Sequence, residues 1–322
     1  MHANRIVIGL VIAAAAAIVA AQPSDAPIAA SPATSPAPSA STAAGLPATS
    51  PMAGIVSRAE NLIEDIDGGQ INWTTGQLIA VGEGKALGAS GQQADMARRA
   101  ARLVAARNAI LLTGGIRVGP GGRFKDVKEA TIKVDAVLEH FEEVASDFDP
   151  QTRTATVRLA VPIFGAHGVV KMFGVRLAAP ARLVAPPKAP QDSGVKVIVI
   201  DARGTGFVPC LLPRIANAAG GVVFDAAQSP AFKSAQPRAP VVYVRMLPKD
   251  DQPQSAPAGK AGGVVLVTAQ KSPAASAGTI TLSDSDADEM MNRLATGGIV
   301  EGGQIVVVAD PPSKPAATRH GQ

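Results

Sequence analysis

The chain of 322 residues has one cysteine, Cys210, and four histidines, at positions 2, 140, 167 and 320. A single cysteine cannot form an intramolecular disulfide, and it cannot supply a thiolate cluster for a structural metal. Four histidines so far apart in the sequence leave little material for a histidine-rich site. We therefore expect no metal centre in this protein.

Aromatic residues are also scarce, with eight Phe, one Trp and one Tyr. Proteins that bind single-stranded nucleic acid stack the bases on several aromatic side chains. The net charge is only +4, and the basic residues are scattered along the chain instead of forming one dense patch. These features argue against nucleic acid as a partner, and the lack of aromatics weighs against a polysaccharide- or peptidoglycan-binding role.

The longest apolar run lies at the N terminus. Residues 6–17 are apolar without interruption after Arg5, and Val19, Ala20 and Ala21 place small residues before Gln22. This pattern is typical of a secretory signal, so we predict a signal peptide over residues 1–21. The alternative is an uncleaved anchor, but residues 6–21 are short for a bilayer that needs about 20 apolar residues. We expect export to the periplasm or cell envelope, with membrane contact only through this segment if it stays uncleaved.

Segments rich in proline and poor in charge divide the remaining chain. Residues 22–54 are mostly Ala, Pro, Ser and Thr, with Asp25 as the only charge. Such a composition cannot bury enough apolar surface to form a core, so we expect a disordered linker. Residues 179–193 form a second proline-rich linker, and residues 311–322 form a tail. Two folded domains are predicted between them, over residues 55–178 and 194–310.

The first predicted domain reads as a helix on a mostly antiparallel sheet. Residues 77–81 are a short apolar strand, and Ser90 with Gln93 three positions later is typical of a helix N-terminus. The helix is expected to end at the glycine pair 114–115. Residues 154–161 alternate between apolar and polar, which indicates a strand with one solvated face. The segment before this strand is ambiguous, and a helix from Val137 onward fits it. The fold class predicted for this domain is α+β.

Two faces of the predicted helix can be distinguished. Larger apolar residues recur at spacings of three and four, so we expect them to pack against the sheet: Met96, Ala100, Leu103, Ala106 and Ile110. Leu103 is accordingly expected in the core. The other face carries Arg98, Arg99 and Arg102, which are interpreted either as a solvated face or as a candidate partner surface.

Several short motifs, taken in order, resemble a known family. They are Asn72-Trp73-Thr74-Thr75-Gly76, Gly82-Glu83-Gly84, Ala97-Arg98-Arg99-Ala100-Ala101, Ala106-Arg107-Asn108 and Gly114-Gly115-Ile116-Arg117-Val118. Over roughly residues 71–165 their order and spacing resemble the LPP20-type envelope proteins of Gram-negative bacteria, which are related to the N-terminal domain of the flagellar assembly protein FlgT. The resemblance implies an exported protein whose partners are other envelope or flagellar-ring proteins, and it brings no catalytic site. The chain departs from the lipoprotein members because no cysteine follows the apolar N-terminal run.

The second predicted domain is rich in strands. Residues 195–200, apart from Lys196, and residues 305–308 are β-branched, which is typical of strands buried on both faces. Residues 241–244 and 264–268 indicate two more strands. A helix with several acidic residues in its first turn is expected to begin at Ser283 or Ser285, which favours the helix dipole. The domain is α/β or α+β, and its topology is left open. Asp201 to Gly204 also resembles a C-terminal extension of some proteins of the same family.

Three charged residues mark a candidate binding cleft in this domain. Asp201 and Asp310 each follow a buried strand, and Arg203 lies two positions after the first of them. Carboxylates at strand ends are where sites often form in sheets of this kind. A structural ion pair is the simpler interpretation of the same three residues.

Two other patterns suggest ligands but fail on spacing. Gly82 and Gly84 follow a strand, yet the next glycine is Gly88, which is one position too far for a dinucleotide-binding loop. A tight turn, or close packing against the helix, explains these glycines better. The acids at 284, 286 and 288 resemble the start of a calcium loop, but Glu289 occupies the required glycine position and Ala295 that of the bidentate glutamate. We expect no bound cofactor.

The sequence therefore favours a non-catalytic protein. Cys210 lies in an apolar segment and is expected to be an inert buried thiol. No recognisable set of nucleophile and base is present. The first hypothesis is an exported envelope protein that acts in assembly or interaction. The alternative is a periplasmic or secreted hydrolase whose site is not recognisable from sequence.

Overall fold

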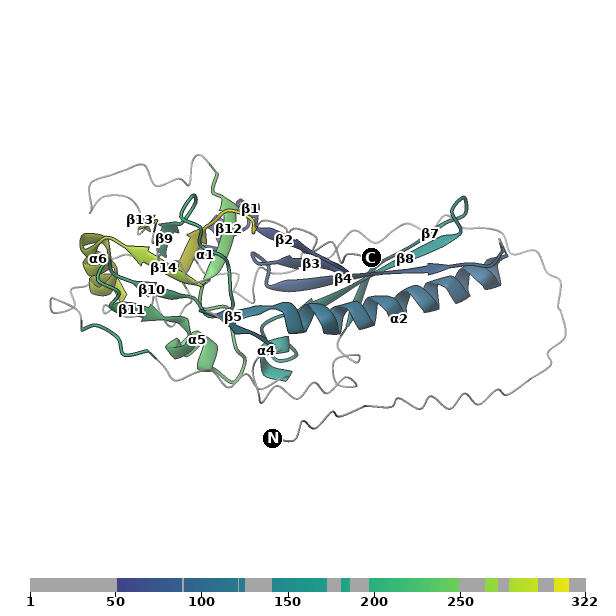
Figure 1. The fold of residues 1–322 in the computed structure, drawn as a ribbon, viewed down its shortest axis with the longest axis horizontal. Helices are drawn as coiled ribbons and strands as arrows, with labels where there is room; N and C mark the ends of the chain where they lie inside the picture. The colour runs from purple at the N-terminus through teal and green to yellow at the C-terminus, as the bar shows by residue number, and fades with distance from the viewer. Residues whose placement is uncertain are drawn as a thin grey trace, which may run out of the picture. The chain divides into compact units, whose positions relative to one another are not determined.

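The computed structural model describes residues 51–88, 90–120, 122–124, 141–172, 181–185, 197–248, 264–271, 278–294 and 304–312, all within one compact unit (Figure 1). The predicted signal peptide, most of the first linker and most of the tail lie outside these residues. The fold is α+β, as predicted, with a helix on an antiparallel sheet and a second, strand-rich part.

The first sheet has five strands in the order β2, β3, β4, β8 and β7, and every neighbouring pair is antiparallel. The strands span Ile63–Ile66 (β2), Gly69–Asn72 (β3), Gln77–Lys85 (β4), Thr154–Pro162 (β8) and Glu142–Asp149 (β7). The predicted alternation of β8 is confirmed, because one face is buried throughout: Ala155, Val157, Leu159 and Val161. The helix expected from Val137 is wrong from residue 142 onward, where β7 begins, and residues 125–140 lie outside the described residues.

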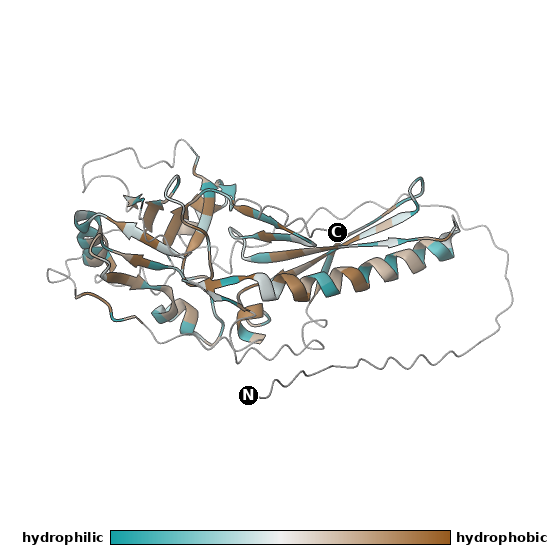
Figure 2. Cartoon of the chain, in the orientation of Figure 1, coloured by the Kyte–Doolittle hydropathy of each residue, from teal (hydrophilic) through white to brown (hydrophobic). Residues whose placement is uncertain are grey.

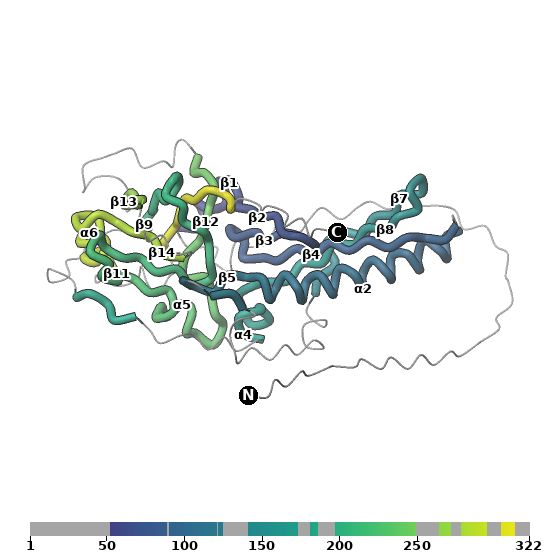
Figure 3. The backbone as a smooth tube through the Cα atoms, in the orientation of Figure 1, coloured from purple at the N-terminus to yellow at the C-terminus, as the bar shows by residue number. Residues whose placement is uncertain are grey.

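One long helix, α2 (Gly91–Gly115), covers a face of this sheet. The predicted start is confirmed, since Ser90 Oγ accepts a hydrogen bond from the Gln93 backbone N–H at 3.4 Å. The helix ends within the predicted glycine pair. The backbone trace shows α2 running alongside β4, and β4 and β8 are the strands that the helix contacts most (Figure 3).

The face of α2 that meets the sheet is not the predicted one. Met96 and Leu103 are 62% and 74% exposed, and Ala100 is exposed as well, so the expectation that these three pack against the sheet is wrong. Ala106, which was expected to pack inward, is buried, and Ile110 is half-buried. The buried face consists mainly of alanines three or four residues apart, together with residues of the last turns: Ala94, Ala97, Ala101, Ala105, Ala109, Leu112 and Thr113.

The reason for this choice of face is steric. A Cβ added to Gly82 would lie 2.1 Å from the Ala101 carbonyl oxygen, and one added to Gly84 would lie 2.2 Å from the Ala97 carbonyl oxygen. The backbones of α2 and β4 therefore approach too closely for large side chains between them. Of the two interpretations of these glycines, a tight turn or close helix packing, the structure bears out close packing, since both lie inside β4. Where α2 passes these glycines, alanines turn inward and the larger Met96 and Leu103 face outward.

The second sheet has eight strands in the order β1, β12, β15, β9, β13, β14, β10 and β11. Its centre is parallel and consists of Val242–Met246 (β12), Ile305–Val308 (β15), Val197–Asp201 (β9) and Val264–Gln270 (β13). Residues 197–200 and 305–308 are all buried, which confirms the predicted strands buried on both faces. Figure 2 shows these central strands mostly in brown, the colour of apolar residues.

The margins of the second sheet are shorter strands. They are Thr279–Leu282 (β14), Arg214–Ala216 (β10), Val222–Asp225 (β11) and, at the opposite edge, Glu60–Asn61 (β1). Leu183 forms an isolated parallel bridge with Val222 in β11, and the Val184 N–H donates to the Val222 carbonyl at 2.8 Å. These residues of the expected second linker therefore extend the sheet edge, which corrects that part of the prediction.

Short elements complete the fold. The predicted acidic helix is α6 (Asp284–Leu294), with Ser283 Oγ accepting from the Asp286 N–H at 3.0 Å and with Met290 and Met291 buried. The remaining described elements are α4 (Val169–Met172), α5 (Pro230–Lys233), the 3-10 turn η3 (Ala226–Gln228) and the small hairpin β5 (Arg117–Gly119) and β6 (Gly122–Arg123).

The first described helix, α1 (Pro51–Val56), corrects the predicted domain boundary at residue 54. Met52 and Val56 are buried among strands of the second sheet, in the cluster that includes Val199 and Val306. Residues 51–61 therefore pack with the second sheet, although the five-stranded sheet follows them in sequence. A larger cluster of buried apolar residues also includes members from both sheets, such as Leu78 and Ile198.

Candidate functional site

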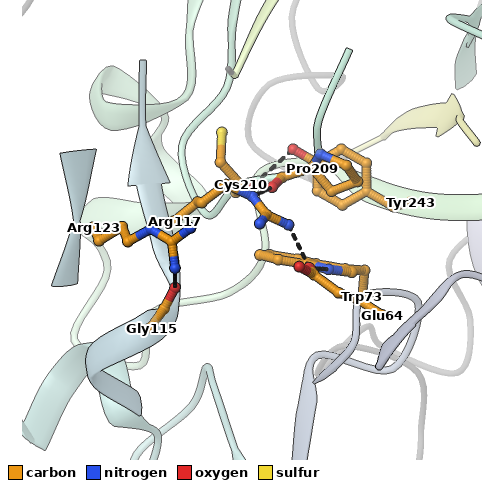
Figure 4. A network of polar contacts seen from close by, with 8 residues as sticks. All are labelled: Glu64, Trp73, Gly115, Arg117, Arg123, Pro209, Cys210 and Tyr243. Atoms are coloured by element: carbon orange, nitrogen blue, oxygen red, sulfur yellow. Dashed lines mark hydrogen bonds and ion pairs between the residues drawn. The ribbon is translucent and has the colours of Figure 1, made fainter. Parts of the chain in front are cut away.

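A buried polar junction links residues from the two sheets (Figure 4). Its centre is Arg117 at the start of β5, whose guanidinium forms an ion pair with Glu64 of β2. The two side chains are only 14% and 8% exposed. Arg117 Nε also donates to the Pro209 carbonyl at 2.8 Å, and the guanidinium carbon lies 5.7 Å from the centre of the Trp73 ring. The junction thus pairs a buried charge and gives its Nε–H a hydrogen-bond partner.

Trp73 and Thr74 extend this junction toward β12. The Trp73 indole N–H donates to Glu64 Oε2 at 2.8 Å, and the Trp73 ring meets the Tyr243 ring edge-on with centroids 5.9 Å apart. The Thr74 hydroxyl donates to the Tyr243 carbonyl at 2.6 Å and accepts from the Leu62 N–H at 2.7 Å. Every polar contact named here is internal, so we interpret the junction as a rigid connection between sheets.

Cys210 lies at the edge of the same junction. The Tyr243 hydroxyl donates to the Cys210 carbonyl at 2.7 Å. Burial raises the pKa of the Cys210 thiol to about 12, and burial also raises the pKa of the Tyr243 hydroxyl well above its usual value. Cys210 is buried, as predicted.

The thiol of Cys210 is expected to resist alkylation in the folded protein. With a pKa near 12, only about one thiol in ten thousand is ionised at pH 8, and the thiolate is the species that reacts. Iodoacetamide at pH 8 should therefore leave the native chain unmodified for hours and modify it fully within minutes in 8 M urea, about the concentration needed to unfold a typical domain. Intact-mass spectrometry measures both. Complete modification under native conditions would contradict this burial.

Sequence reasoning did not identify the Glu64–Arg117 pair. The two residues are 53 positions apart, and neither belongs to a motif with chemical meaning. The only signal was indirect, since Trp73, Thr74 and Arg117 lie in segments that carry the family resemblance.

The candidate cleft residues of the second sheet do lie together. Arg203 donates to both carboxylate oxygens of Asp201, at 2.9 and 2.6 Å, and the Gly204 N–H donates to Asp310 Oδ2 at 2.6 Å. The hydrogen bond from Arg203 holds the pKa of Asp201 below its usual value. Because β9 and β15 are parallel neighbours, their carboxyl ends meet at the same edge. The arrangement matches the simpler interpretation, a structural ion pair that fastens the loop after β9.

The three arginines predicted as a partner surface lie on exposed positions of α2. Arg98 pairs with Asp95 at 2.9 Å and lies 5.8 Å from the centre of the Phe148 ring, and Arg102 lies 3.7 Å from Glu143. Phe148 and Glu143, the two contacts that lie outside α2, both belong to β7. Arg99 is exposed, and no salt bridge to it is seen among the described residues.

A second exposed surface lies beside these arginines. We name it the outer stripe, and it consists of Met96, Ala100, Leu103, Val104, Arg107 and Leu111. Its members follow one another at helical spacings, so they share the side of α2 turned away from the sheet. Figure 2 shows brown, pale and teal bands alternating along this helix. Sequence reasoning assigned Met96 and Leu103 to the core and therefore missed this surface.

The protein is of the α+β class. One long helix covers its antiparallel sheet, and a buried polar junction connects this sheet to the mixed eight-stranded sheet. Residues 197–311 match a family model described as the second domain of Treponema pallidum Tp0624. The match begins at β9 and includes β15, so the similarity concerns the second sheet and leaves α2 and the first sheet outside. No curated protein matches the chain. No helix among the described residues combines the length and apolar character needed to span a membrane.

Proposed function

We propose that this chain is an exported, non-catalytic protein of the bacterial cell envelope that acts by binding other envelope proteins. Its partners on this proposal are envelope or flagellar-ring proteins, as the resemblance to LPP20-type proteins implies. The partner surface is the set of arginines on α2: Arg98, Arg99 and Arg102.

The observation that carries this proposal is the orientation of α2. A helix of 25 residues turns its alanines toward the sheet and presents arginines and large apolar side chains to solvent. Large exposed apolar groups next to charged ones are typical of protein interaction sites. The sheet behind the helix holds its backbone in place, so the surface is preorganised for binding, which lowers the ordering cost of association.

Three further observations support the proposal. Cys210 is buried, and Arg203 forms an ion pair with Asp201 of the same chain. The N-terminal pattern of residues 1–21 is that of an exported protein. The similarity of residues 197–311 to a domain of a Treponema pallidum protein supports a bacterial origin, in which export leads to the envelope.

Reversing the charge of the arginine surface is expected to reduce partner capture at least tenfold. The variant carries Arg98→Glu, Arg99→Glu and Arg102→Glu. Charged groups at the edge of an interface steer association and make it sensitive to salt, so the captured amount of wild type should also fall as salt is raised. The measurement is affinity capture from envelope extracts after mild crosslinking, with captured proteins quantified by mass spectrometry.

A matched control changes the net charge equally at exposed positions outside α2, through Arg153→Glu, Arg158→Glu and Arg182→Glu. Circular dichroism of both variants checks that the fold is retained, because exposed ion pairs contribute only about 0–1 kcal/mol each. Equal capture by wild type and the α2 variant would show that the arginines are merely solvated. Capture reduced equally by both variants would indicate a general effect of charge.

A further inference from the structure

We propose that the outer stripe of α2 binds the same stripe of a second copy of this chain, with the two helices antiparallel around a two-fold axis that passes between Leu103 and Val104. The proposal goes beyond the function above, because it assigns a self-association site next to the surface assigned to other proteins.

The first argument is the exposure of the stripe. Leu103 is 74% exposed, Met96 and Leu111 are each 62% exposed, and Val104 is also exposed. These four are the exposed large apolar side chains of α2, and leaving them in water along one helix side is unfavourable. A single helix laid along the stripe would cover all of them, because the stripe is one helix wide.

The second argument is the spacing of the stripe, which reads the same in both directions about its midpoint. In an antiparallel pair with that midpoint, Met96 lies level with Leu111 of the second copy, and Leu103 lies level with Val104 of the second copy. Ala100 then lies level with Arg107 of the second copy, so the smallest side chain of the stripe faces the longest. A two-fold interface requires this self-complementarity, since each contact occurs twice.

The third argument is charge, which favours an antiparallel pair over a parallel one. In a parallel pair the two Arg107 side chains would face each other. In the antiparallel pair they are seven positions apart, about 10 Å along the helices, which is about a Debye length at moderate salt. The stem of Arg107 packs over Ala100 while its guanidinium reaches solvent. Arg98 and Arg102 are already engaged with Asp95 and Glu143.

The length of the stripe sets the expected strength. From Met96 to Leu111 the helix extends about 24 Å, roughly four turns. Two helices in contact over this length bury a total surface near the lower limit of about 1,000 Å² for specific association. We therefore expect a reversible dimer. Added salt should leave the dimer unchanged or strengthen it, because the residual charges on the two stripes have the same sign.

The first test is sedimentation velocity of the purified full chain, between about 1 and 200 µM, where modest dimers dissociate measurably. Wild type should shift from monomer to dimer with concentration. Leu103→Glu should raise the dissociation constant at least tenfold, since it places two carboxylates near the axis. Adding Val104→Lys in the same chain should restore association, because each carboxylate then faces an ammonium of the other copy. Arg158→Glu serves as a control that should leave association unchanged.

The second test fixes the direction and register by oxidative crosslinking. The single native thiol is buried and does not compete. Met96→Cys chains mixed with Leu111→Cys chains should form a mixed disulfide dimer, whereas Met96→Cys chains by themselves should form none. All positions are exposed, so the fold should persist, and circular dichroism checks this.

Several outcomes would overturn the proposal. They are a chain that stays monomeric throughout the concentration range, a Met96→Cys dimer that indicates a parallel pair, and failure of the double variant to recover. None of these outcomes bears on the capture of other envelope proteins, which is measured separately. Failure of the dimer proposal and failure of the proposed function can therefore be distinguished.

Discussion

Replacing Gly82 with alanine is expected to lower the free energy of unfolding by about 3 kcal/mol or more, a large share of the roughly 5–15 kcal/mol that holds a typical domain. The added Cβ would lie 2.1 Å from the Ala101 carbonyl oxygen and 2.2 Å from the Ala105 nitrogen. Both are backbone atoms of α2, so no side chain can rotate away. The helix would have to move off β4 and lose its alanine contacts.

The matched control is Gly91→Ala, a glycine of α2 that does not face the strand. Gly91 is the first residue of α2, and an added Cβ there would meet nothing within 4 Å. Alanine at this position should leave stability unchanged or raise it by up to about 1 kcal/mol. Urea unfolding followed by circular dichroism compares the two variants. If both had the wild-type midpoint, the helix would not approach the strand as closely as described.

Local signals made two strands of the first sheet, β4 and β8, and the ends of α2 predictable. The alternation over residues 154–161 fixed both the strand and its buried face, because side chains of a strand point alternately to opposite sides. Ser90 and the glycine pair 114–115 defined the ends of α2 because caps satisfy backbone groups within a few residues. The β-branched runs of β9 and β15 marked central strands for the same local reason. None of these predictions needed knowledge of which elements meet.

The buried face of α2 could not be read from hydrophobicity alone. The rule that larger apolar residues lie inside assumes that the separation between helix and sheet is free to adjust. Here Gly82 and Gly84 allow a closer approach, and the alanines follow it at spacings of three and four. Had the glycines and the alanines been read as one feature, Leu103 would have been placed outside.

The candidate residues show the same division between local and distant information. Asp201 and Arg203 are two positions apart in the sequence, so their pairing is local. Asp310 could be grouped with them because neighbouring parallel strands end at the same edge of a sheet. The pairing of Glu64 with Arg117 depends on how two sheets meet, and no local pattern encodes it. The spacing symmetry of the outer stripe is present in the sequence, but its meaning depends on knowing that Leu103 is exposed.

Removing the charge of Glu64 is expected to destabilise the protein strongly. Glu64→Gln leaves Arg117 with its positive charge in a site where the side chain is only 14% exposed. An unpaired buried charge costs about 3–5 kcal/mol. The chain has a single tryptophan, and Trp73 donates to this carboxylate. Tryptophan fluorescence during urea unfolding therefore reports on the site directly.

The matched control is Glu60→Gln, which removes the same charge from a pair at the protein surface. Arg245 and Glu60 are 2.9 Å apart, but their side chains are 54% and 49% exposed, so the loss should be at most about 1 kcal/mol. A double variant, Glu64→Gln with Arg117→Met, separates the effect of charge from that of packing. It should recover part of the stability lost in Glu64→Gln, because no buried charge is then left unpaired. Similar small losses for Glu64→Gln and Glu60→Gln would mean that water reaches Arg117 and that the junction does not bury its charge. A double variant no more stable than Glu64→Gln would mean that the contacts of Arg117 with Pro209 and Trp73, rather than its charge, hold the two sheets together.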